Sequence, residues 1–146
     1  MKPFPNLVAV WGSSAAGKTA TSLKLALSLL EENRSVLLLF PDDTTPTIPC
    51  LCGEKELTKT GSLGSLFIAP RITSTLLSYH LTLPKEIQHL AFLGFEKGEH
   101  RYRYPTPSTT QCSDILRLCS GLADILLVDI PTSFSKDMLS TMALLR

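Results

Sequence analysis

An eight-residue pattern near the N-terminus, G-x-x-x-x-G-K-S/T, constrains the fold more than any other feature of the chain. The segment runs Gly12-Ser13-Ser14-Ala15-Ala16-Gly17-Lys18-Thr19, and every fixed position of the pattern is filled. Small residues let successive backbone N–H groups turn inward around an anion, and a helix that begins at the lysine adds its positive end. The pattern therefore predicts a strand, a phosphate-holding loop and a helix, in that order.

The residues on both sides of the loop fit that order. Leu7–Trp11 is a short apolar run with strand character, and from Lys18 onward apolar residues recur at helical spacing (Ala20, Leu23, Leu27 and Leu30) until Asn33. We therefore predict that residues 12–19, with Ala20 in the first helical turn, contact the phosphates of ATP or GTP. Lys18 is expected to reach the β- and γ-phosphates, and Thr19 to give its hydroxyl to Mg2+.

Further apolar runs extend the same architecture. Strands are predicted at Val36–Phe40, Leu90–Phe95 and Asp124–Asp129, and helices at Pro70–Tyr79, Ser113–Leu122 and Ser135–Arg146; Pro41–Cys52 and Glu96–Thr110 are predicted loops, and Gly61–Ala69 is weakly patterned. Strands that are apolar throughout need helices on both faces. The sequence therefore predicts an α/β three-layer sandwich with a mostly parallel sheet, the P-loop NTPase fold.

Length and composition narrow the class of protein. With 146 residues, 44% hydrophobic and 18% charged, the chain is expected to form one globular domain, residues 1–146. No apolar run reaches membrane-spanning length, so we expect a cytoplasmic protein without an integral membrane segment. A net charge of +1 gives no long-range field for a nucleic-acid partner, which is therefore not expected.

Two carboxylate positions are predicted at the ligand-binding edge of the sheet. Asp129 follows four apolar residues at the end of a strand, the Walker B arrangement, and is expected to hold Mg2+ beside Thr19. Asp42 and Asp43 follow the second strand, and ligands of open α/β sheets bind at the carboxyl ends of strands. We assign Asp42 and Lys18 as catalytic candidates; the alternative for Asp42 is an Asx-turn beside Pro41.

Together, the N-terminal phosphate loop, Asp42 and the segment Ala123–Pro131 resemble the ParA/MinD branch (SIMIBI class) of P-loop ATPases. That branch includes pilus-assembly and secretion-localising members that are TadZ- or CpaE-like. The resemblance implies ATP and Mg2+ as ligands, a nucleotide-dependent homodimer, and a protein partner from a secretion or pilus system. It covers essentially the whole chain, and its motifs match fully at the phosphate loop and at Asp129.

Two departures from the family pattern concern hydrolysis. ParA/MinD proteins usually carry a lysine early in the loop that crosses to the partner subunit's nucleotide, whereas this chain has Ser13, Ser14 and Ala15 there. The glycine that usually follows the Walker B aspartate is absent from residues 130–133. Such domains also run longer, which implies an incomplete C-terminal half.

The expected function is a slowly hydrolysing, Mg2+-dependent ATPase that acts as a positioning or regulatory switch. A small-molecule or nucleotide kinase is an alternative, with Arg71, Arg101 and Arg103 as candidate phosphate ligands, and a scaffold that binds nucleotide without turnover is another. The segment Arg101–Tyr104 alternates arginine and tyrosine, residue types enriched at protein interfaces. We expect it to contact a protein partner, or else to be a loop whose two tyrosines pack at its base.

Overall fold

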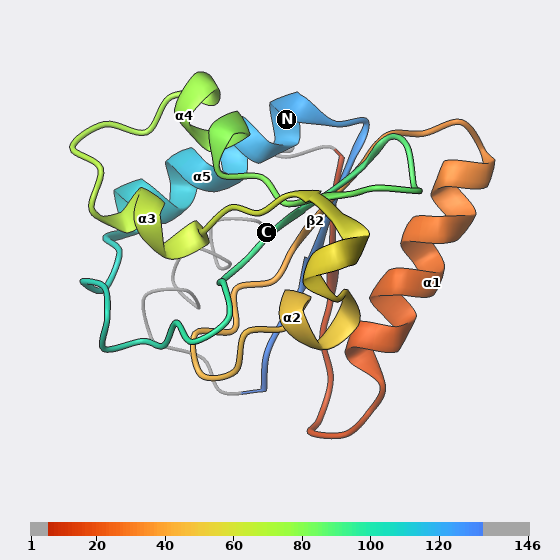
Figure 1. The fold of residues 1–146 in the computed structure, drawn as a ribbon, viewed down its shortest axis with the longest axis horizontal. Helices are drawn as coiled ribbons and strands as arrows, with labels where there is room; N and C mark the ends of the chain where they lie inside the picture. The colour runs from red at the N-terminus through yellow and green to blue at the C-terminus, as the bar shows by residue number, and fades with distance from the viewer. Residues whose placement is uncertain (1–5, 133–146) are drawn as a thin grey trace.

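The computed structural model describes residues 6–132. Figure 1 shows a central sheet whose two faces are covered by helices, with α1 on one side and α5 on the other. In chain order the elements are β1 (Leu7–Val10), α1 (Lys18–Glu31), β2 (Val36–Leu39), α2 (Ile48–Leu51), η1 (Glu54–Glu56), β3 (Leu57–Lys59), α3 (Leu63–Phe67), α4 (Ser74–Tyr79), β4 (Leu83–Pro84), β5 (Leu90–Leu93), α5 (Thr109–Leu122) and β6 (Ile125–Asp129).

The main sheet has the order β1-β6-β2-β5, and its three neighbouring pairs are parallel. β6 lies between β1 and β2, with Leu7 opposite Leu126 and Val36 opposite Ile125. β3 and β4 form a separate antiparallel pair. The predicted α/β fold with a parallel sheet is confirmed.

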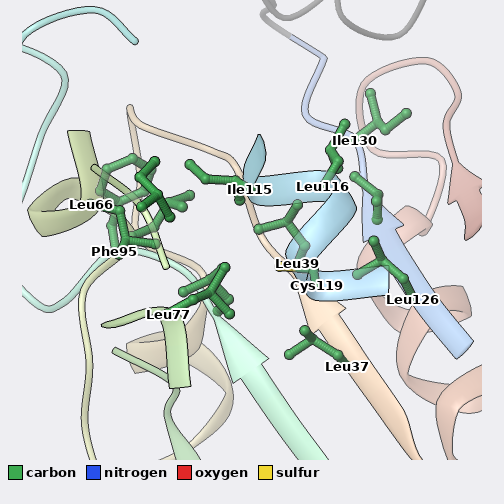
Figure 2. Packing of buried hydrophobic residues seen from close by; sticks show 14 residues of the cluster. Leu37, Leu39, Leu66, Leu77, Phe95, Ile115, Leu116, Cys119, Leu126 and Ile130 are labelled. Atoms are coloured by element: carbon green, nitrogen blue, oxygen red, sulfur yellow. The ribbon is translucent and has the colours of Figure 1, made fainter. Parts of the chain in front are cut away.

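The two faces of the sheet bury separate apolar clusters, as the period of two along each strand requires. In β2, Leu37 and Leu39 point to the face covered by α3, α4 and α5, whereas Val36 and Leu38 point to α1 and α2. Figure 2 shows the first cluster, where Leu126 of β6 lies among side chains from α5 and β2. The sheet is therefore the middle of three layers.

The first helix forms where it was predicted, but its buried face differs in part from the predicted one. Ser22 and Ala26 are the buried residues of α1, whereas Leu27 is 47% exposed. Small side chains allow the helix backbone to approach the sheet closely. Leu23 and Leu30 of the predicted face do pack against the core, whereas Ser22 could not be found from apolar periodicity because it is polar.

Several local predictions need correction. The segment Pro41–Cys52 is not loop throughout, because Ile48–Leu51 forms α2, and the weakly patterned segment Gly61–Ala69 contains α3. α4 begins at Ser74 rather than Pro70, since the Thr73 side chain accepts a hydrogen bond from Leu76 N and caps the helix there.

The strongest helix start was also missed. α5 begins at Thr109, four residues before the predicted start, because Ser108 and Gln111 form a reciprocal capping box. That signature is visible in the sequence as Ser-Thr-Thr-Gln. The predicted closing helix, Ser135–Arg146, lies outside the described residues. Within residues 6–132, no helix is long and apolar enough to cross a bilayer.

Candidate phosphate and magnesium site

The loop between β1 and α1 has the backbone geometry of an anion cradle. Ala15 and Gly17 adopt left-handed conformations, with φ of 59° and 77°, among residues of ordinary handedness. Alternating backbone handedness points successive N–H groups to one side, which makes a concave anion-binding surface. Gly17 occupies the N-cap of α1 without a side chain to cap it, so the first N–H groups of α1 remain available to a ligand.

Lys18 extends across the mouth of this loop. Its Nζ donates to the carbonyl oxygen of Ser13 at 2.9 Å and to Thr132 Oγ1 at 3.0 Å. The ammonium group therefore joins the loop to the segment that follows β6. Both acceptors are neutral oxygen atoms. A phosphate oxygen would be a stronger acceptor for this ammonium group, because a negative charge strengthens the hydrogen bond.

Thr19 and Asp129, the two predicted metal ligands, lie in direct contact. Thr19 Oγ1 donates to Asp129 Oδ2 at 2.6 Å, and Ser22 Oγ lies 3.1 Å from Asp129 Oδ1. Asp129 is 7% exposed, and both of its oxygens accept hydrogen bonds from hydroxyl groups. Ser22 was missed by the sequence reasoning, although its position three residues after Thr19 on a helix places both side chains on the same face.

The sheet register places Asp129 beside the loop. Val10, the last residue of β1, pairs with Asp129, the last residue of β6, and Ile130 N donates to Val10 O at 2.9 Å. Parallel neighbours bring their carboxyl ends to the same edge, so the loop that follows β1 and the carboxylate that ends β6 necessarily meet.

A cavity of about 150 Å³ lies at this edge. Three segments line it: the start of α1, the loop after β2, and the chain after β6, with lining residues Lys18, Thr19, Asp42, Thr47, Asp129, Ile130, Pro131 and Thr132. The structure thus brings together four predicted site residues, Lys18, Thr19, Asp42 and Asp129. It adds Thr47 and Thr132, for which the sequence carried no motif.

Asp42 takes part in a local turn as well as lining the cavity. Its Oδ1 accepts hydrogen bonds from Thr44 N at 2.9 Å and Thr45 N at 3.1 Å, which is an Asx-turn. Asp42 therefore lies at the predicted edge of the sheet and also forms the alternative Asx-turn, while its catalytic role stays a prediction. One carboxylate oxygen is committed to the turn.

Asp43 and Arg101 connect the loop after β2 to the loop after β5. Arg101 Nη2 lies 3.0 Å from Asp43 Oδ1 and 3.0 Å from Thr44 Oγ1, and Arg101 N donates to Asp43 O at 2.8 Å. Arg101 is thus engaged within the chain. We call this set of contacts the Arg101 latch.

The two tyrosines beside Arg101 have different surroundings. Tyr102 is 87% exposed, whereas the Tyr104 hydroxyl donates to the buried carboxylate of Glu99. The Tyr104 ring covers Gly64 so closely that any side chain at position 64 would collide with it. One tyrosine therefore packs at the base of the loop, and the other is free to meet a partner.

The donor set of the site fits magnesium. Thr19, Ser22 and Asp129 offer two hydroxyl oxygens and a carboxylate, and Mg2+ takes hard oxygen ligands, commonly one or two protein groups together with water and phosphate oxygens. The carboxylate already accepts two hydrogen bonds from hydroxyl groups. A cation held by Thr19 and Asp129 would compete with these hydrogen bonds for the same oxygen atoms.

Comparison with known proteins shows the fold. A scan against family models and a search of curated proteins gave no match. Among solved structures, the septum site-determining protein MinD of Pyrococcus horikoshii, complexed with Mg-ADP, is similar with a TM-score of 0.68 and 18% identity, over 94% of this chain and 53% of that one. The cell division ATPase MinD of Pyrococcus furiosus has a TM-score of 0.58 and 15% identity, over 95% and 55%. The chain spans about half the length of these MinD structures.

Proposed function

We propose that this protein binds ATP together with Mg2+ at the cavity edge and acts as a slowly hydrolysing, nucleotide-dependent switch. The observation that carries the proposal is the contact of Thr19 with Asp129 beside the N-terminus of α1, where Gly17 supplies no side-chain cap. One edge of the sheet brings together three kinds of group. Thr19 and Asp129 offer a hydroxyl and a carboxylate to a metal, Lys18 offers a positive charge to phosphate, and the loop offers backbone N–H groups to an anion.

Each residue has a definite role in this proposal. The N–H groups of residues 13–19, with Ala20 in the first helical turn, surround the phosphates. Lys18 exchanges Ser13 O and Thr132 Oγ1 for phosphate oxygens. Thr19 and Asp129 hold the metal, directly or through a water. Bound Mg2+ would neutralise charge on the phosphate oxygens.

Slow turnover follows from what the loop lacks. Ser13, Ser14 and Ala15 occupy the positions where the related ATPases carry their crossing lysine. A missing electrostatic donor typically costs about 100- to 1,000-fold in rate. Binding needs only the cradle, Lys18 and the metal ligands. A site that binds well and hydrolyses slowly suits a switch, with homodimerisation or a secretion or pilus protein as its readout.

The experiment is a titration with Mg-ATP, read by the fluorescence of Trp11. This is the single tryptophan of the chain, it is 79% exposed, and it directly precedes Gly12. Lys18→Ala is expected to weaken binding by about 100-fold, because it removes a hydrogen-bonded charge from the phosphates. Lys24→Ala removes an exposed lysine of the same helix outside the loop and is the matched control. Equal affinity of Lys18→Ala and parent would refute the proposal.

The two alternatives make different predictions. A kinase would transfer phosphate to an acceptor molecule, and a scaffold would bind nucleotide with neither turnover nor a change in association. Among the described residues, no arginine lines the cavity, and Arg101 is engaged in the latch. The kinase alternative therefore has no specific support from the site. Nucleotide-dependent association measured by analytical ultracentrifugation separates the switch from the scaffold.

A further inference from the structure

Ser22 is a buried polar residue of α1, the helix that packs against β6. Its exposed fraction is 0%, and its Oγ lies 2.9 Å from Lys18 O and 3.1 Å from Asp129 Oδ1. Thr19 and Asp129 are among the described residues that line the cavity, whereas Ser22 is not. Because Ser22 lies behind the cavity wall, it can act on a ligand there only through the residues that it contacts.

The Ser22 hydroxyl has one proton and two acceptors within reach. In an α-helix the backbone N–H of residue i donates to the carbonyl of residue i−4, so Lys18 O is already supplied by Ser22 N. The Asp129 carboxylate carries a negative charge and is the stronger acceptor of the two. We therefore assign the hydroxyl proton to Asp129 Oδ1, an assignment that leaves no buried carbonyl unpaired.

The two oxygens of Asp129 have different neighbours. Oδ2 accepts a hydrogen bond from Thr19, which lines the cavity, and Oδ1 accepts one from Ser22, which does not. In the proposed function a metal takes the Thr19 oxygen, so the hydrogen bond from Thr19 is the one open to replacement. A carboxylate has about four lone-pair sites, which lets Oδ1 keep its bond to Ser22 while the carboxylate serves a ligand.

The side chain of Asp129 depends on these two donors for its orientation. As the last residue of β6, Asp129 has its backbone fixed by the sheet, while its side-chain dihedral angles are set by contacts. Among the described residues, Thr19 and Ser22 are the two that donate to its carboxylate. A buried charge must be met by donors or by an opposite charge. Once Thr19 turns to a metal, Ser22 is the donor that still fixes the carboxylate.

We propose that Ser22 is a positioning residue, which holds Asp129 Oδ1 and thereby orients the carboxylate for the metal that accompanies the nucleotide. The inference rests on the proposed nucleotide and metal site, and it adds a residue that acts only through Asp129. The contacts of Ser22 with Lys18 O and Asp129 also join the first turn of α1 to the end of β6. The phosphate-binding lysine and the carboxylate are thus held in register from behind.

The test measures the ATP affinity of the full chain in excess Mg2+ and in EDTA, and the ratio of the two affinities is the Mg2+ effect. Ser22→Ala removes the hydroxyl, and Ser22→Cys fills the same space with a weak donor. Loss of a hydrogen-bond partner of a metal ligand typically costs about 10- to 100-fold in metal affinity, so both variants should make the Mg2+ effect about tenfold smaller. ATP affinity in EDTA should stay close to that of the parent.

Two control variants separate positioning from helix packing. Ser28→Ala makes the same change at an exposed position of α1 and should behave as the parent. Ala26→Gly weakens the buried face of α1 one turn after Ser22, at a residue that does not contact Asp129. It should lower the melting temperature and still preserve the Mg2+ effect, which a purely structural role of Ser22 would not distinguish from Ser22→Ala.

The double variant of Ser22→Ala with Asp129→Asn tests whether Ser22 acts through the carboxylate. If it does, the double variant should have the same Mg2+ effect as Asp129→Asn alone, because residues in direct contact are not additive. Additive losses would overturn the inference, as would a parental Mg2+ effect in Ser22→Ala or in Ser22→Cys.

The outcomes also separate this inference from the proposed function. If the parent binds no ATP, or binds it equally in Mg2+ and in EDTA, the proposed function fails and the inference fails with it. If the parent shows a Mg2+ effect that Ser22→Ala preserves, the inference alone fails. A reduced Mg2+ effect in both Ser22 variants, with no further loss in the Asp129→Asn background, supports both.

Discussion

Thr19 Oγ1 and Asp129 Oδ2 lie 2.6 Å apart, although 110 residues of sequence separate the two side chains. The contact exists because β1 and β6 are parallel neighbours whose carboxyl ends coincide. It joins the last residue of the phosphate-loop pattern to the last residue of a buried strand. The metal dependence of binding can be tested directly at this pair.

Asp129→Asn is expected to reduce the effect of Mg2+ on ATP affinity. The amide loses the negative charge but keeps one oxygen for the hydroxyl of Thr19, so the local packing survives. Mutation of the hydrogen-bond partners of a metal ligand typically costs about 10- to 100-fold in metal affinity, so loss of the charge of the ligand itself should cost at least as much. The measurement is ATP affinity with excess Mg2+ and with EDTA. Asp114→Asn, a surface carboxylate that pairs with Arg117, is the control, and an equal Mg2+ effect in Asp129→Asn and parent would contradict the metal role.

Steady-state phosphate release by the parent is expected to be slow, well below the roughly 10 per second of a typical enzyme. Asp42→Asn should slow it further with little change in melting temperature, because an asparagine oxygen can still accept the hydrogen bonds from Thr44 N and Thr45 N. Asp42→Ala removes both the charge and the turn, and so separates the two roles. Release at parental rate in Asp42→Asn would show that Asp42 is only a turn residue.

Arg101→Ala should loosen the loop after β2 more than it destabilises the fold. The latch is an exposed ion pair, worth about 0–1 kcal/mol, so the melting temperature should change little. Hydrogen exchange at Thr44 and Thr45 should nevertheless accelerate. Arg103→Ala is the matched control, since Arg103 lies over the Tyr104 ring rather than in the latch. Equal exchange in both variants would show that the latch does not order this loop.

The protein-contact prediction for residues 101–104 has its own test. Tyr102 and Arg103 are exposed, so a partner would meet them first. Tyr102→Ala combined with Arg103→Ala should release such a partner without disturbing the latch. The comparison is a pull-down with ATP present, in which unchanged capture would assign the segment a role within the chain only.

Cys119 supplies a test of burial that depends on pH. Burial raises the pKa of its thiol to about 12, so the thiol stays protonated in the folded protein at pH 8. An exchange-type thiol reagent should therefore modify exposed Cys50 in the native protein and reach Cys119 only after unfolding. The same pKa shift makes the free energy of unfolding depend on pH. The thiol has a pKa near 9 in the unfolded chain and a raised pKa in the folded one, so its contribution to stability is fully present below pH 9. That contribution is lost as the pH rises toward 12. Rapid native modification of Cys119 would contradict the packing.

The fold was predictable where one physical signal dominates. A strand such as Val36–Leu39 is buried on both faces, and its unbroken apolar run predicts a buried strand directly. The phosphate-loop pattern in turn requires a strand before it and a helix after it. The short helices α2 and α3 were not predictable in this way. Each has five residues or fewer, too short for apolar periodicity to appear, and each is held by tertiary packing of residues such as Ile48 and Leu66.

The site divides in the same manner. Motifs name Lys18, Thr19 and Asp129, because phosphate and metal chemistry fixes both residue type and spacing. Three other residues of the site could be identified only from the structure: Ser22, Thr47 and Thr132. Serine and threonine are common on helices and in loops, and no motif requires them at a fixed spacing. Asp42 both forms a turn and lines the cavity. Its position depends on the path of the loop after β2, which the local sequence does not determine.

The place of β6 in the sheet sets an order of events during synthesis. The first two strands of the chain are not neighbours, because the gap between them is filled by the last strand described. A ribosome-bound chain that ends before residue 125 therefore has the whole phosphate loop but lacks the strand that joins β1 to β2 and the carboxylate that faces Thr19. Pairing of such distant segments is slow relative to local structure. Under the proposed function, the capacity to hold a metal-bound nucleotide would arise in one late step, when β6 inserts between β1 and β2, and its appearance on a growing chain would time that insertion.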